Sequence, residues 1–277
     1  MTLRSRWRAQ ESHRTRDLDA ITNQDRTTYQ RRGWFAAVDP ALPAADFHYN
    51  EGVQDLHKRA FVGLLRLLII LGALLFLPPW TLHYWQAWIF LLVFFAPVLA
   101  ITIYLMKKDP NLLQWRVNAG PAAEKEGRQK TIQFLASIAF IAVIVFPAID
   151  HRFAWSRVPP YVGLAGDALV ALGLLIIFFV FKENTFTSGV IEVHPEQKVI
   201  STGPYTLVRH PMYIGALVML LGVPLALGSW WGLPTIIPIT LAIVWRLLDE
   251  EAFLAKNLPG YSEYRNKVRY RLLPFVW

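Results

Sequence analysis

Charged residues are scarce in this sequence, and cysteine is absent. Only 17% of the 277 residues are Asp, Glu, Lys or Arg, whereas a soluble domain contains about a quarter. Hydrophobic residues make up 54% of the chain, so we expect lipid to be the solvent for much of it. The lack of cysteine excludes a disulfide framework and a thiolate metal site, and no other metal-ligand set is predicted. A nucleophile must therefore be an oxygen or nitrogen group or belong to a substrate.

Long windows without charge predict the membrane spans. Residues 67–106, 131–149 and 210–245 contain no Asp, Glu, Lys or Arg, and residues 158–181 contain only Asp167. A helix needs about 20 apolar residues to cross the hydrocarbon core, so the first and third windows are long enough for two helices each. The sequence predicts an all-α fold, a polytopic transmembrane bundle of about six helices at residues 61–78, 85–106, 131–149, 161–182, 212–228 and 232–249.

The distribution of positive charge predicts the orientation. Of the 28 Lys and Arg residues, 25 lie in residues 1–60, 107–130, 182–211 and 245–277, all on one side of the predicted bundle. Because basic loops stay in the cytoplasm, both termini are expected there. The net charge of +8 is then explained by membrane topology, and we predict membrane lipid and no nucleic acid as a partner.

Two parts of different character follow from this pattern. Residues 1–60 form a polar, partly disordered cytoplasmic arm, and residues 61–277 form the membrane domain, in which residues 182–277 hold the motifs. The oligomeric state is not encoded in any pattern that we recognise.

A first polar cluster precedes the fifth predicted helix. Gly203-Pro204 is a turn signal, and Arg209 and His210 precede Pro211, which suits the first position of a helix. Free backbone N–H groups beside a cationic pair can bind an anion. The alternative is that Arg209 and His210 are only membrane anchors on the cytoplasmic side.

A second cluster is expected at the end of the sixth helix, in the sequence RLLDEE. Arg246 and Glu250 are four residues apart and share a helical face. Acids in the last turn of a helix oppose its macrodipole, so their cost must be offset. Either basic residues such as Arg246 and Lys256 neutralise the acids, or a cationic ligand lies against them.

The segments GPYTLVRHPMYIG, RLLDEE and PGYSEYRNKVRYRLLP, with KENTFTSG upstream, resemble the isoprenylcysteine carboxyl methyltransferase family and the related phospholipid N-methyltransferases. The resemblance is to bacterial-type members and implies a bacterial inner membrane location, with the cytoplasmic loops and C-terminal tail forming the site. It implies S-adenosylmethionine as the cofactor. The cofactor-binding residues that it implies are Gly203, Pro204, Tyr205, Arg209, His210, Pro211, Tyr213, Glu250 and Glu251.

The acceptor implied by the resemblance is a lipophilic small molecule or a lipidated substrate. A carboxylate acceptor is already ionised at neutral pH and needs no general base, in which case Arg246 orients it with help from Asn184. An amine or phenol needs a base, for which His210 or Glu250 is available.

Two other functions remain open. Membrane sterol and steroid reductases, which use NADPH, share the RHPxY piece, but for them we expect an acid in place of Gly215 and no RxxxEE motif of this form. A non-catalytic membrane accessory protein of the same fold is the second alternative.

Overall fold

The computed structural model describes residues 43–277 except 121, 125 and 195, with backbone only for residues 43–53. The chain divides into two compact units, residues 1–54 and residues 55–277, and the following describes the second. Residues 1–42 of the predicted arm lie outside the described residues.

Eight α-helices and no strand are found in the described residues. Each of the six predicted helices is present, although α2 begins at Pro43 rather than at 61 and α8 continues to Asn257. Two short helices and two 3-10 turns were not predicted. In chain order the elements are α2 (Pro43–Phe76), α3 (Trp85–Lys108), α4 (Pro110–Val117), α5 (Gly127–Phe153), α6 (Pro160–Glu183), η1 (Gly203–Thr206), α7 (Pro211–Ala226), η2 (Leu233–Thr235), α8 (Ile236–Asn257) and α9 (Tyr261–Lys267).

In the described part of the chain, four helices are long and apolar enough to cross a membrane: residues Gln54–Phe76 of α2, then α3, α5 and α6. Their outer faces expose large apolar side chains, including Ile69, Leu92 and Phe134, which is the pattern of an integral membrane protein. The apolar helix α7 has 16 residues, or about 24 Å at 1.5 Å per residue, against about 30 Å of hydrocarbon.

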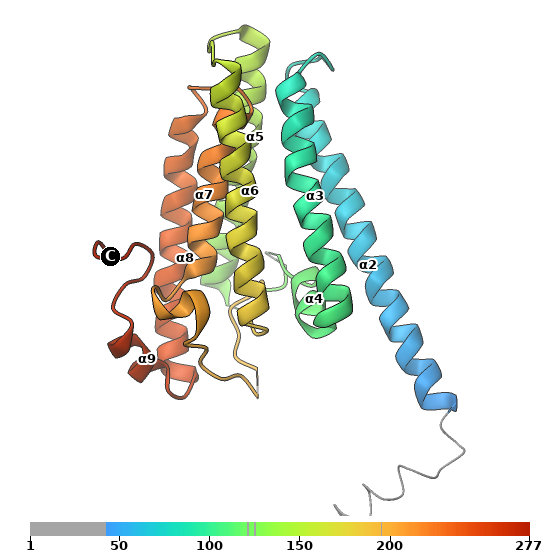
Figure 1. Ribbon diagram of the computed structural model, residues 1–277, viewed down its shortest axis with the longest axis vertical. Helices are drawn as coiled ribbons and strands as arrows, with labels where there is room; N and C mark the ends of the chain where they lie inside the picture. The colour runs from blue at the N-terminus through green and yellow to red at the C-terminus, as the bar shows by residue number, and fades with distance from the viewer. Residues whose placement is uncertain (1–42, 121, 125, 195) are drawn as a thin grey trace, which may run out of the picture. The chain divides into compact units, whose positions relative to one another are not determined.

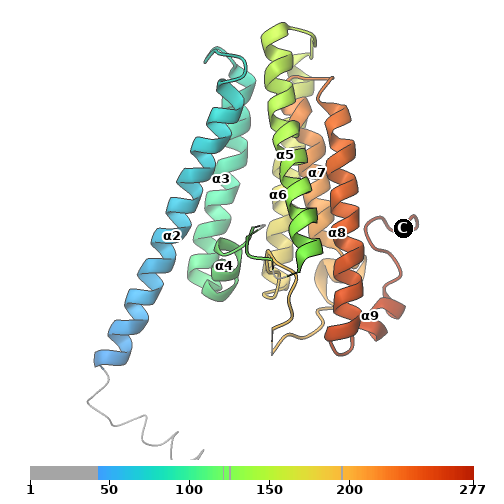
Figure 2. The same cartoon turned by 180° about the vertical axis from the view of Figure 1, so that it is seen from behind.

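Successive long helices run in opposite directions, and this gathers the loops at two ends (Figure 1). The loops that follow α2, α5 and α7 lie at one end, as the charge pattern predicted. The segments that follow α3, α6 and α8 lie at the other, which we call the site end. Figure 2 shows the same grouping from behind.

Helices α6 and α7 touch through glycines. A Cβ added at Gly173 of α6 would lie 2.5 Å from the backbone oxygen of Gly215, and one at Gly222 of α7 would lie 2.5 Å from the oxygen of Gly166. Backbones this close require residues without a side chain, as in many membrane helix pairs. The contact fixes the end of α6 beside the start of α7, where the polar motifs lie.

At the opposite end, Asp150 joins three segments. Its carboxylate accepts hydrogen bonds from the backbone N–H of Ser156 at 2.7 Å, from the Ser156 hydroxyl at 2.5 Å, and from the Ser229 hydroxyl. The residue is buried, and these bonds compensate for the loss of hydration. The loops after α5 and α7 are thereby held together.

We predict that Gly173→Ala destabilises the protein by about 1–3 kcal/mol, because the added methyl group must separate α6 from α7. The midpoint of thermal unfolding in detergent measures this. Gly63→Ala is the control, since nothing lies within 4 Å of a Cβ at Gly63. Equal midpoints for the two variants would contradict the close backbone contact.

Candidate functional site

A cavity of about 310 Å³ opens at the site end. It is lined by the end of α6, the segment after it, η1, the start of α7, the second half of α8, and α9. Eight of the predicted site residues line it, and they are Asn184, Tyr205, Arg209, His210, Pro211, Tyr213, Arg246 and Glu250. The other three, Gly203, Pro204 and Glu251, do not.

The start of α7 is positioned by the chain's C-terminal segment. Pro211 is the first residue of the helix, as predicted. The backbone N–H groups of Arg209 and His210 donate to the carbonyls of Tyr270 and Arg271 at 2.9 and 3.0 Å. These residues are therefore fixed by a segment about 60 residues away in sequence, as the bonds from Arg209 to Val268 and Arg269 confirm.

Glu251 is the centre of a buried ion cluster. Its carboxylate accepts from Nε of Arg209 at 2.6 Å and from Nε of Arg271 at 2.8 Å, and it lies 3.2 Å from Nε2 of His210. Burial alone raises the pKa of Glu251, but the hydrogen bonds from His210, Arg271 and Arg209 outweigh burial and lower the pKa to about 2. This geometry favours a structural role for Glu251, which holds Arg209 and His210 of the cavity wall in place.

Glu250, by contrast, faces the cavity. Its Oε2 accepts a hydrogen bond of 2.6 Å from the Tyr213 hydroxyl. The structure thus brings the polar cluster before α7 and the acidic cluster of α8 to one level, although the two are about 40 residues apart in sequence.

The predicted position of the acids in the last turn of the helix was wrong. Helix α8 continues to Asn257 because the residues after Glu251 favour a helix, and its last turn carries Lys256, whose charge complements the macrodipole. Each acid also has a different partner. Asp249 pairs with Arg128 at 3.3 Å and accepts from Gln129, Glu250 bonds Tyr213, and Glu251 forms the ion cluster.

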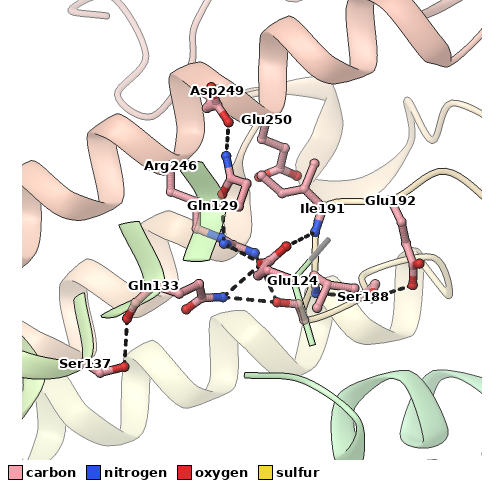
Figure 3. Close-up of polar contacts among 12 residues, drawn as sticks. Glu124, Gln129, Gln133, Ser137, Ser188, Ile191, Glu192, Arg246, Asp249 and Glu250 are labelled. Atoms are coloured by element: carbon pink, nitrogen blue, oxygen red, sulfur yellow. Dashed lines mark hydrogen bonds and ion pairs between the residues drawn. The ribbon is translucent and has the colours of Figure 1, made fainter. Parts of the chain in front are cut away.

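Arg246 pairs with Glu124, a residue that the sequence analysis missed (Figure 3). Nη1 of Arg246 lies 2.8 Å from Oε1 of Glu124, and Nη2 donates to the Gly189 carbonyl at 3.0 Å. Glu124 is 3% exposed and also accepts from Gln133 and from the backbone N–H of Ile191. The pair joins the loop before α5, the segment after α6, and α8.

Asn184 is held next to an aromatic wall. Its amide donates to the Tyr205 hydroxyl at 2.9 Å, and its Oδ1 accepts from the backbone N–H of Phe186. The Tyr264 hydroxyl donates to the Tyr205 carbonyl at 2.8 Å. Burial raises the pKa of Tyr205, so its hydroxyl stays protonated at neutral pH.

Gly203 and Pro204 do not line the cavity, but they position the chain beside it. Gly203 has φ +55°, and a Cβ there would lie 2.8 Å from the Glu183 carboxyl carbon, so the turn η1 requires glycine. Glu183 in turn accepts from the Thr202 hydroxyl. These residues set the path of the chain into Tyr205.

Two further residues of the cavity were missed. Arg116 of α4 contacts the carbonyls of Thr187 and Ser188, and the buried hydroxyl of Tyr261 has no hydrogen-bond partner in the described part of the chain. In the sequence, both residues lie in polar segments between or after the predicted helices and resemble ordinary surface residues. Only the folded chain brings them to the same cavity.

Comparisons with known proteins agree with the motif resemblance. The chain is 28% identical over 205 residues to the Delta(14)-sterol reductase of Mus musculus, a match that covers 62% of this chain and 49% of the reductase. It therefore spans about half the length of that relative. Two probable protein-S-isoprenylcysteine O-methyltransferases from Oryza sativa, of the subspecies indica and japonica, are 28% identical over 172 residues, covering 56% of this chain and 87% of theirs.

A family model, phospholipid methyltransferase, matches residues 162–259. This segment runs from the first turn of α6 to the end of α8 and contains the glycine contact, the start of α7 and all three acids of α8. Over this segment, about a third of its length, the chain is therefore similar to the phospholipid methyltransferase family.

Proposed function

We propose that this protein is a membrane methyltransferase that uses S-adenosylmethionine and acts on a lipophilic acceptor, most simply a carboxylate. The observation that carries the proposal is the cavity at the site end, which Glu250, Arg246 and Asn184 line together beside helices with exposed apolar surfaces. The rice relatives, whose names describe O-methyl transfer to isoprenylcysteine, support it.

The residues of the cavity fit S-adenosylmethionine. The ligand carries both positive and negative groups, and the cavity offers the Glu250 carboxylate together with arginine side chains. Tyr261 lines the cavity, and its buried hydroxyl has no partner among the described residues, so a hydrogen bond from a ligand to this group would remove a cost of about 1–3 kcal/mol. When bound, the cofactor supplies a methyl group activated by its sulfonium charge.

The chain's own residues then have separate tasks. Glu250 holds a cationic group, and Tyr213 fixes the orientation of that carboxylate. Arg246, itself held by Glu124, and Asn184, held by Tyr205, orient the acceptor. The buried aromatic wall excludes water, which is the main requirement for an in-line displacement between bound partners. A carboxylate acceptor needs no proton removed.

The match to the mouse sterol reductase favours a reductase as the second candidate. Such an enzyme was expected to have an acid in place of Gly215. A Cβ at this position would lie 2.9 Å from the Gly173 oxygen, so the contact between α6 and α7 has no room for a carboxylate. The methyltransferase therefore agrees better with the packing.

We further propose that the site end faces the cytoplasm of a bacterial cell and that the protein lies in the inner membrane with both termini inside. The 25 basic residues of the four basic segments support this orientation, because only Arg152, in the last turn of α5, and Arg157 lie at the opposite end.

We predict that the purified protein binds S-adenosylmethionine in calorimetry and that Glu250→Gln weakens binding about ten-fold to a hundred-fold, since a charged hydrogen bond contributes about 1.5–3 kcal/mol. The variant keeps an acceptor for Tyr213 and should fold normally. Glu263→Gln, on the exposed surface of α9, is the control. Binding of NADPH in place of S-adenosylmethionine would favour the reductase.

Glu251→Gln should act on stability instead. Removing this charge leaves the buried Arg209 and the partly exposed Arg271 without this counter-ion, so we expect a loss of about 3–5 kcal/mol in the free energy of unfolding. The folded-state pKa of about 2 lies below the ordinary 4.5. The stabilisation is thus complete above pH 4.5 and is lost as the pH falls through 2. Thermal unfolding between pH 2 and 6 tests this, and a variant as stable as the wild type at pH 6 would refute the structural role.

Arg246 and Glu124 should affect turnover more than cofactor affinity. With N-acetyl-S-farnesyl-L-cysteine as acceptor, we expect Arg246→Gln to lower turnover by at least about ten-fold and Glu124→Gln to lower it less, because the guanidinium then loses only its counter-ion. The dissociation constant of S-adenosylmethionine, measured on the same samples, should change less than about three-fold. Parallel losses of affinity and turnover would instead place Arg246 on the cofactor wall.

A further inference from the structure

We propose that Arg116 is the carboxylate-binding residue of the cavity, a role that rests on the proposed function. The ligand group is a planar carboxylate, supplied either by the amino-acid part of the methyl donor or by the acceptor. Neither the motifs nor the family match includes Arg116, which lies in α4, before the matched residues.

The arginines that line the cavity differ in whether a carboxylate balances their charge. Arg209 lies 2.6 Å from Glu251, and Arg246 lies 2.8 Å from Glu124. Arg116 has no such partner, because no carboxylate oxygen lies within 4 Å of its guanidinium in the described part of the chain. Of these three arginines, Arg116 alone has its charge uncompensated.

Arg116 also makes few hydrogen bonds to the protein. Nη1 of Arg116 donates to the carbonyls of Thr187 and Ser188 at 3.5 and 3.4 Å, which is the outer limit for a hydrogen bond. Within the described residues, Nε and Nη2 donate no hydrogen bond to the protein. A guanidinium has five N–H donors arranged as a fork, so most of its capacity is available to a ligand in the cavity.

The Arg116 side chain is held in place by its neighbours. The guanidinium lies over the Phe181 ring, 4.9 Å from its centroid. The backbone beside it is also tightly packed, since a Cβ at Gly189 would lie 2.1 Å from the Ala119 Cβ. The carbonyls of residues 187 and 188 face Arg116 and that of Gly189 faces Arg246, so one short segment holds both guanidinium groups.

These features together describe an anion subsite. Burial lowers the pKa of Arg116 to about 10, so the side chain remains charged at neutral pH in an environment that disfavours an unpaired charge. A carboxylate matches the fork with two parallel hydrogen bonds and supplies the missing negative charge. Glu250, with its neutral Tyr213 partner, takes the cationic group in the same cavity.

The test compares ligands with and without the carboxylate. Calorimetry on the full chain in detergent measures S-adenosylmethionine against decarboxylated S-adenosylmethionine, and N-acetyl-S-farnesyl-L-cysteine against its amide. We expect Arg116→Gln to abolish the preference for the carboxylate form in one of the two pairs, a change of about ten-fold to a hundred-fold. The pair affected identifies the source of the carboxylate. Arg116→Lys should retain part of the preference, because it keeps the charge and loses the fork.

The control is Arg59→Gln, which removes an exposed arginine of α2 that pairs with Asp55. Thermal unfolding of each variant verifies that it is folded, and loss of an unpaired charge should not destabilise Arg116→Gln. An unchanged carboxylate preference in both pairs would overturn this inference alone. A wild type that binds neither donor nor acceptor would overturn the proposed function, and this inference with it.

Discussion

Glu251 holds together three segments that are distant in the sequence. Its buried carboxylate bonds Arg209 before α7 and Arg271 of the C-terminal segment from its own position on α8. Ion pairs of this kind are costly to bury and costly to break, so they fix one arrangement of the groups that form them. The direction of Arg209 and His210, and with it the start of α7, follows from this cluster.

The cavity is thus built on two constraints of different kinds. Glycines bring α6 and α7 into backbone contact within the apolar part of the bundle, where packing and close approach determine the geometry. At the site end the chain leaves the helices, and hydrogen bonds and ion pairs take over. Arg246 pairs with Glu124 and Glu251 pairs with Arg209, whereas Glu250 accepts a hydrogen bond from Tyr213 and lines the cavity.

The charged residues of the site form two groups, which differ in whether an oppositely charged side chain lies at hydrogen-bonding distance. Arg209 and Glu251 pair with each other and stabilise the fold, whereas Glu124 pairs with Arg246 and holds it at the cavity, where we propose that it orients the acceptor. Within the described residues, Arg116 and Glu250 lie in the same cavity without a charged partner at this distance, so their charges are available to a ligand. The same residue types therefore have different roles, and the distinction depends on neighbours that are 40 to 120 residues away.

The sequence by itself predicted the six apolar helices, of which four are long enough to span a membrane, because a long apolar window has no stable alternative to a helix in lipid. It also predicted that Pro211 begins a helix and that Arg209, His210, Arg246 and Glu250 lie close together, and all four line the same cavity. It did not determine the end of α8, since the apolar window stops at Trp245 whereas helix propensity continues to Asn257. Only the tertiary structure assigned Glu251 to an ion cluster and brought Glu124 and Arg116 to the cavity. Hydropathy predicts which segments lie in lipid, and local spacing predicts which side chains share a helical face. The partner of a buried charge depends instead on packing between segments that are distant in the sequence.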